Sequence, residues 1–207
     1  VLEVISRDFA GAWQGSADAT RREWTADATH ARVLIHEVLA INTSTHLHDG
    51  LYPDVIELYN NSPVAVDLGG MSLSDDPNEP TKFVFSAGTT IASEEYLLVH
   101  AEDAPLAGAT GIYLGFQLDG DGESVTLYDA TQTPVDSIDF GVQIADRSIG
   151  RIGSDRHWAL TQPTLGAANV PQRTAAPGEV LINEWFAAGD VVLTEDFVEL
   201  HNPDPLP

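Results

Sequence analysis

Two short stretches decide the fold, Val33-Leu-Ile-His-Glu-Val-Leu-Ala40 and Asp54-Val-Ile-Glu-Leu-Tyr-Asn60. Both are rich in Val, Ile and Leu, and both are followed closely by Asn and Ser, which favour turns. Similar runs recur along the chain, and no stretch keeps a 3.6-residue apolar period over three helical turns. Short strands at regular spacing, separated by turn residues, predict an all-β, antiparallel β-sandwich.

Both stretches also recur near the end of the chain. The first matches Val180-Leu-Ile-Asn-Glu-Trp-Phe-Ala187 at five of eight positions, and the second matches Asp196-Phe-Val-Glu-Leu-His-Asn202 at four of seven. The offsets are 180 − 33 = 147 and 196 − 54 = 142, so the intervening loop is five residues shorter in the second copy. A period this long indicates tandem domains rather than a solenoid.

The repeat and the Pro-Gly-containing segment between its copies predict the domain organisation. Because residue 1 is a valine, we expect a fragment of a longer polypeptide. The expected parts are the end of an upstream module or an N-terminal extension (1–31), a complete sandwich (32–170), a linker (171–178) and the truncated start of a second copy (179–207).

Composition excludes several classes of function. Nine basic and 32 acidic residues give 9 − 32 = −23, which disfavours binding to phosphate backbones and to anionic membranes. The chain has no cysteine, so disulfides, cysteine-ligated zinc and thiol nucleophiles are absent. No apolar run approaches the ~20 residues of a membrane span. A high content of acidic residues with a single lysine, Lys82, is typical of proteins in high salt or of acidic extracellular surfaces.

The two defining stretches each contain one glutamate, Glu37 and Glu57, and Glu184 and Glu199 occupy the matching places in the second copy. Two carboxyls facing each other across a cleft act as acid and base in glycoside hydrolysis. The alternative is structural: each carboxylate accepts backbone N–H bonds or pairs with an arginine such as Arg147 or Arg151. Recurrence in a tandem module favours structural carboxylates over catalytic ones.

The turn Asp119-Gly-Asp-Gly-Glu123 is a candidate calcium site. Its three carboxylates, on Asp119, Asp121 and Glu123, alternate with glycines, and calcium prefers clustered oxygen ligands on a flexible loop. The twelve-residue EF-hand frame is missing. The alternative is a solvated hairpin turn whose glycines permit positive φ. No other cofactor is expected.

Histidines and one serine offer two weaker patterns. His46 and His48 project from one side of an extended segment, a spacing that can bind zinc, but no third ligand lies nearby in the sequence. An exposed loop is the alternative. A hydrolase triad could be assembled from Ser74, Asp75 and His100 by residue type alone. The Gly-x-Ser-x-Gly elbow that would support it does not occur. The chain also lacks a P-loop and a dinucleotide fingerprint.

A series of motifs follows in order along residues 33–169: Ile35–Ala40, Asp54–Asn60, Val66–Asp76, Lys82–Phe85, Gly88–Ile91, Tyr96–Val99, Gly122–Asp129, Val135–Gln143, Ser148–Arg151, Trp158 and Pro163–Asn169. This series resembles the bacterial lamin tail domain. The resemblance implies an immunoglobulin-like β-sandwich without catalytic residues. It also implies a place in large secreted or surface proteins. The basic nucleic-acid surface of animal relatives has no counterpart at a net charge of −23.

We therefore expect a non-catalytic binding or architectural module of a larger secreted or cell-surface bacterial protein. The alternative is a carbohydrate-binding accessory module of a secreted hydrolase, which needs a row of exposed aromatic side chains. The protein or glycan ligand is not specified by the sequence. Residues 180–207 are too apolar to stay exposed. We expect them to pack on the first sandwich, on residues 1–31, or on another copy of the chain by self-association.

Overall fold

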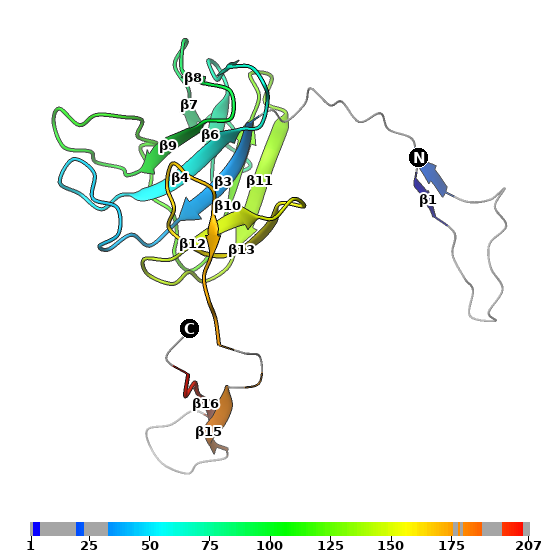
Figure 1. The fold of residues 1–207 in the computed structure, drawn as a ribbon, viewed down its shortest axis with the longest axis vertical. Coiled ribbons are helices and arrows are strands. Elements are labelled where there is room, and N and C mark those ends of the chain that lie inside the picture. Colours follow the sequence, from blue (N-terminus) through cyan, green and yellow to red (C-terminus); the bar gives the residue numbers. More distant parts are fainter. Residues whose placement is uncertain are drawn as a thin grey trace. The chain divides into compact units, whose positions relative to one another are not determined.

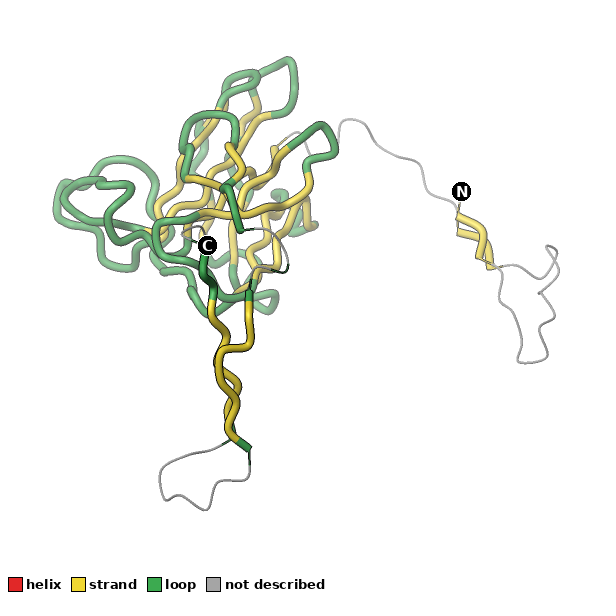
Figure 2. The backbone as a smooth tube through the Cα atoms, turned by 60° about the horizontal axis from the view of Figure 1, so that its bottom comes forward, coloured by secondary structure: helices red, strands yellow, loops and turns green. Residues whose placement is uncertain are grey.

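The computed structural model describes residues 2–4, 20–22, 33–175, 178, 180–187 and 196–204. The chain divides into two units, residues 1–32 and 33–207. The first unit contains one antiparallel pair, β1 (Leu2–Val4) and β2 (Thr20–Arg22). The described parts consist of strands and loops without a helix (Figure 2). In these parts, accordingly, no helix has the length and apolar character to cross a membrane.

The described part of the second unit contains two main sheets and two short strand pairs, all with antiparallel pairing (Figure 1). This arrangement confirms the predicted all-β sandwich. The six-stranded sheet has the order β14 (Val170–Pro171), β13 (His157–Gln162), β12 (Ser148–Ile152), β3 (Val33–Leu39), β4 (Asp54–Asn60) and β9 (Tyr96–Ala101). The four-stranded sheet is β11 (Pro134–Phe140), β10 (Glu123–Tyr128), β6 (Ser72–Ser74) and β7 (Phe83–Val84), and one short pair is β5 (Val66–Asp67) with β8 (Thr90–Ile91).

The core lies between the two main sheets. The six-stranded sheet contributes Ile56 and Val99, among others, and the four-stranded sheet contributes Leu73, Val125 and Leu127. All five side chains are fully buried. Burying an aliphatic side chain of this size stabilises the fold by about 1.5–3 kcal/mol. The apolar residues that alternate along each strand therefore join the sheets face to face.

A β-bulge in β3 decides which side chains leave the core. Ile35 and Val38 both belong to the core although they are three residues apart, which strict alternation forbids. The β3–β4 register shifts between Ile35 and Glu37, as a bulge requires. Beyond the bulge Glu37 pairs with Glu57, whose strand neighbours Ile56 and Leu58 face the core. Both glutamates therefore project from the outer face of the six-stranded sheet.

A separate hairpin lies near the end of the described chain. It consists of β15 (Leu181–Phe186) and β16 (Phe197–His201), paired antiparallel. Its register also shifts at one place, between Ile182 and Glu184. These positions match Ile35 and Glu37 of the first copy. The hairpin thus repeats the local geometry of β3 and β4.

Candidate functional site

The outer face of the six-stranded sheet carries polar and aromatic side chains among aliphatic ones. Along β9 this face presents alternate residues, so Tyr96 and His100 share it. They pair with Tyr59 and Val55 of β4, at opposite ends of the strand pair. Two groups of side chains form on this face: a glutamate network near the middle and a histidine cluster at one end.

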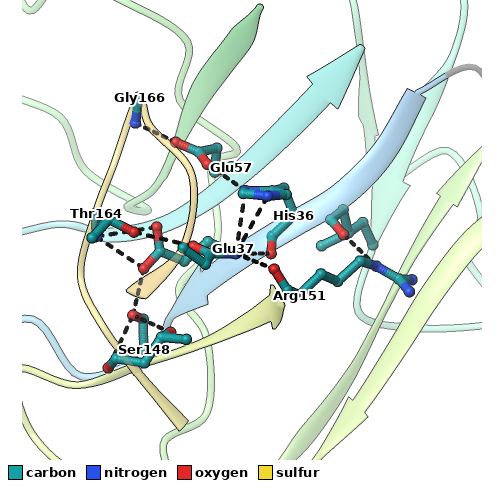
Figure 3. A network of polar contacts seen from close by, with 10 residues as sticks. His36, Glu37, Glu57, Ser148, Arg151, Thr164 and Gly166 are labelled. Atoms are coloured by element: carbon teal, nitrogen blue, oxygen red, sulfur yellow. Dashed lines mark hydrogen bonds and ion pairs between the residues drawn. The ribbon is translucent and has the colours of Figure 1, made fainter. Parts of the chain in front are cut away.

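The two glutamates hold a loop rather than face a cleft. Glu37 accepts hydrogen bonds from the Ser148 hydroxyl at 2.5 Å and from the Thr164 backbone N–H at 3.1 Å (Figure 3). Glu57 accepts a hydrogen bond from the Gly166 backbone N–H, and its Oε1 lies 2.8 Å from His36 Nδ1. Both glutamates are 0% exposed. The loop 163–169 is therefore fastened to β3 and β4 by two buried carboxylates.

Burial sets the electrostatics of Glu37. It raises the pKa of the Glu37 carboxyl from 4.5 to about 7, although the hydrogen bonds from Ser148 and Thr164 oppose the rise. The neighbouring Glu57 carboxylate raises this pKa further. A raised pKa is typical of a general acid, but it arises here under a loop that leaves no exposed surface on the carboxyl. The geometry is that of a structural contact.

Asn169 and Gly150 complete the attachment of the loop. The Asn169 side-chain amide donates to the backbone oxygens of His36 and Arg151, both at 3.0 Å. A Cβ placed on Gly150 would lie 2.5 Å from Asn169 Cγ, so glycine is needed for this close approach. The loop thus bonds to β3, β4 and β12 together. It covers the sheet face that would otherwise expose the glutamates.

Arg151 binds an aspartate of the opposite sheet instead of a glutamate. Its guanidinium donates to both oxygens of Asp136, at 2.7 and 3.0 Å, and its Nε donates to the Ile35 backbone oxygen at 2.9 Å. The guanidinium also lies 4.3 Å from the centroid of the Trp158 ring. Asp136 belongs to β11 and Arg151 to β12, so this ion pair connects the two sheets.

A pocket of about 250 Å³ lies beside the network. His36, Tyr59 and Tyr96 pack together in its wall, with ring centroids 4.9–5.5 Å apart. Arg151 and Arg156 also line it. Arg151 bonds to Asp136 and Arg156 to Asn61, so both guanidiniums already have acceptors.

The histidine cluster gathers residues from distant parts of the chain. His46 and His48 lie in the loop 41–53 between β3 and β4, and His100 lies near the end of β9. Nε2 atoms of His46 and His100 are 3.3 Å apart, and the rings of His48 and His100 stack with centroids 3.8 Å apart. In the described residues, these three side chains form a group whose metal-ligating atoms all lie within 4.8 Å of one another.

Sequence reasoning found two of these three histidines and missed the third. His46 and His48 were predicted as a possible zinc site without a third ligand. His100 was considered only as part of a catalytic triad with Ser74 and Asp75. The structure separates that triad: the Ser74 hydroxyl donates to the Asp76 backbone oxygen, and Asp75 pairs with Lys82. The sequence feature that could have pointed to His100 was the alternation of side chains along β9, which puts His100 on the outer face of the sheet. It gave no information on which loop lies nearby.

Two of the candidate calcium ligands accept hydrogen bonds from the backbone of their own turn. The Asp121 N–H donates to Asp119 Oδ1 at 2.8 Å, and the Asp119 N–H donates to Glu123 Oε2 at 3.3 Å. Burial raises the pKa of the Glu123 carboxyl. In the described residues these three carboxylates do not form a group with ligand atoms within 4.8 Å. Calcium binding stays a prediction.

Exposed aromatic side chains are scarce on the sandwich. Within residues 33–175, the exposed aromatic side chain is Tyr52, at 43%. Tyr59 and Tyr96 are half-buried against each other. Trp13 and Trp24 lie outside the described residues. The row of rings that a carbohydrate platform needs is not formed in this described range.

Comparison with known proteins assigns the family. Curated protein sequences gave no match. A family model for the lamin tail domain matches residues 26–141, which is more than half of the 207 residues. The match covers β3 to β11, and β12 to β14 extend the same six-stranded sheet. Lamin tail domains are a non-enzymatic, immunoglobulin-like family. The sequence match and the all-β sandwich agree, and the chain belongs to the lamin tail domain family.

Proposed function

We propose that this chain is a non-catalytic binding or architectural module of a larger secreted or cell-surface bacterial protein. The observation that carries the proposal is the enclosure of Glu37 and Glu57. An acid–base pair must reach a substrate in an open cleft. These carboxyls are 0% exposed and accept hydrogen bonds from the Thr164 and Gly166 backbone. Their geometry supports the structural role.

The overall charge supports a location outside the cell and away from nucleic acid. A net charge of −23 keeps the chain soluble and repels phosphate backbones and anionic lipids. The proposed location rests on this acidity together with membership in the lamin tail domain family.

The hairpin of β15 and β16 supports an architectural role. Its apolar side chains are exposed, with Trp185 at 73% and Ile182 at 63%. An exposed two-stranded hairpin also has unpaired strand edges, which accept a further strand. We propose that residues 180–207 mediate self-association of the isolated chain.

The test of the non-catalytic role compares the wild type with Glu57→Gln. We expect no turnover by either protein on a panel of chromogenic glycosides and esters. We also expect Glu57→Gln to speed amide exchange at Gly166, measured by hydrogen–deuterium exchange, because its backbone N–H loses a charged acceptor. Glu95→Gln, an exposed glutamate on the same sandwich, is the matched control. Turnover that Glu57→Gln abolishes and Glu95→Gln preserves would refute the proposal.

A further inference from the structure

We propose that His46, His48 and His100 form a binding site for a divalent transition metal of the zinc type, which links the loop 41–53 to β9. Three imidazole nitrogens are a frequent zinc donor set, with a fourth position left to water or another ligand. The three residues are the group of metal-ligating side chains whose ligand atoms lie within 4.8 Å in the described chain.

The spacing of the nitrogens suits a tetrahedral ion. Two ligands at about 2.0–2.1 Å from a tetrahedral zinc are about 3.3–3.4 Å apart. The Nε2 atoms of His46 and His100 are 3.3 Å apart. The His48 ring stacks on that of His100 with 9° between the ring planes, so binding requires His48 to turn toward the ion. His48 is half-buried, and the rotation breaks the contact of its Nε2 with the Thr110 backbone oxygen at 2.8 Å.

His100 shows an unused polar group in the interior. The residue is 3% exposed, and its buried Nδ1 has no hydrogen-bond partner. Its Nε2 faces the nitrogen of another imidazole, His46. A buried polar atom without a hydrogen-bond partner destabilises the fold. A metal ion between the two rings would bond to the Nε2 atoms of His100 and His46, which now face each other.

The loop that carries His46 and His48 is held in place by its own turn. His48 and Leu51 exchange backbone hydrogen bonds at 2.9 and 3.0 Å across Asp49 and Gly50. Both central residues have positive φ, 48° and 83°, which is the two-residue hairpin turn that Asp-Gly favours. This turn fixes the direction in which His48 leaves the loop. The turn thus holds the His48 backbone beside His100, and only the ring has to rotate to bind the ion.

A second loop fastens the cluster from the other side. The Thr110 backbone N–H donates to Asp49 Oδ2 at 2.5 Å, and His48 Nε2 lies 2.8 Å from the Thr110 backbone oxygen. A Cβ on Gly111, which has φ of +95°, would lie 3.3 Å from His48 Nε2 and 3.4 Å from His100 Cε1. Glycine therefore keeps this space beside the rings clear. Asp49 Oδ2 lies 3.4 Å from His48 Nε2, so a carboxylate stands next to the cluster.

The charge around the cluster suits a cation. A chain of net charge −23 also raises the local concentration of cations.

The two copies of the repeat differ at this loop. The loop 41–53 is five residues longer than its counterpart 188–195, and the counterpart contains no histidine. His46 and His48 therefore come with a segment that the β3–β4 pair does not need for its own pairing. The cluster is a property of the first copy.

The experiment measures metal binding by the full chain without a histidine tag, after treatment with a chelator. Calorimetric titration with Zn²⁺ should show one equivalent bound, and Co²⁺ should give the visible absorption of a tetrahedral site. His46→Gln and His48→Gln should each weaken Zn²⁺ binding about tenfold or more, since even a residue behind a ligand changes affinity by 10–100-fold. At 100 times Kd, Zn²⁺ should raise the Tm by about 5–10 °C.

The matched control is His157→Gln. His157 is exposed and lies outside the cluster, so this variant should bind Zn²⁺ as the wild type does. His100→Gln is avoided because loss of a buried ring can unfold the sandwich. In histidine NMR spectra, Zn²⁺ should shift the signals of three of the seven histidines. Equal affinity in His46→Gln, His48→Gln and the wild type, or millimolar binding with no difference between Zn²⁺ and Ca²⁺, would overturn the proposal.

Discussion

The strand pair β3–β4 and the hairpin β15–β16 have nearly the same sequence and opposite environments. Ile35 pairs with Leu58 and Glu37 with Glu57; at the matching positions Ile182 pairs with Leu200 and Glu184 with Glu199. Yet Leu58 is 0% exposed and Leu200 is 64% exposed.

The difference lies in what covers each pair. β3 and β4 have the four-stranded sheet on one face and the loop 163–169 on the other. The side chains of β15 and β16 are exposed along most of both strands. Register and bulge are therefore set within the pair, whereas stability comes from the layers on either side of it. This comparison yields four predictions.

Truncation of a leucine to alanine should show the largest difference in stability between the two strand pairs. Leu58→Ala removes a side chain from the packed core and should destabilise the sandwich by about 2–5 kcal/mol. Leu200→Ala, at the matching place in the hairpin, should change stability by less than about 0.5 kcal/mol. Urea denaturation of both variants measures the difference. Equal losses would show that the hairpin is covered as the first copy is.

Glu37 should make stability depend on pH. Its pKa is raised from 4.5 to about 7 in the folded chain, so the folded state binds the proton more tightly than the unfolded state. This contribution is complete below about pH 4.5 and is lost as the pH rises through 7, a fall of about 2–3 kcal/mol.

Thermal melting from pH 5 to pH 8 measures this effect. Glu37→Gln should flatten the curve, and a residual slope should remain from Asp54, whose pKa burial also raises to about 7. Glu184→Gln, which alters the exposed matching position, should leave the slope unchanged. A wild type that gains stability as the pH rises from 5 to 8, with the gain lost in Glu37→Gln, would contradict the assignment.

Substitutions of Glu57 and Glu199 should differ less widely in their effect on stability than the leucine truncations do. Glu57→Gln weakens the contacts to His36 and to the Gly166 N–H inside the sandwich and should destabilise it by about 1–3 kcal/mol. Glu199→Gln changes an exposed group and should leave the melting midpoint where it is. The prediction fails if the two substitutions lower the midpoint equally.

Removal of the hairpin should have the smallest effect on stability. A chain that ends at residue 178 should melt as the wild type does, because the sandwich keeps its own core. Light scattering should report concentration-dependent association for the wild type and a monomer for the shortened chain. Persistent association after truncation would place the contact outside residues 180–207.

Much of the fold could be predicted from the alternating strand pattern. The β3 and β4 strands lie at the two stretches from which they were predicted, and the all-β sandwich is confirmed. The bulge at Ile35 to Glu37 was not predicted, because no residue type marks a bulge without its partner strand. The hydrogen bond between Glu37 and Thr164, 127 residues away, could not be predicted from the sequence either.

The sequence by itself determined the strands and the turns, because alternation and turn residues act over a few neighbouring positions. It also determined the acidity that disfavours nucleic acid. Only the tertiary structure decided that Glu57 is buried under a loop 109 residues away, and that His100 joins His46 across 54 residues. The physical reason is range: pairing needs only adjacent strands, whereas burial and ligand geometry depend on which distant segments cover the sheet.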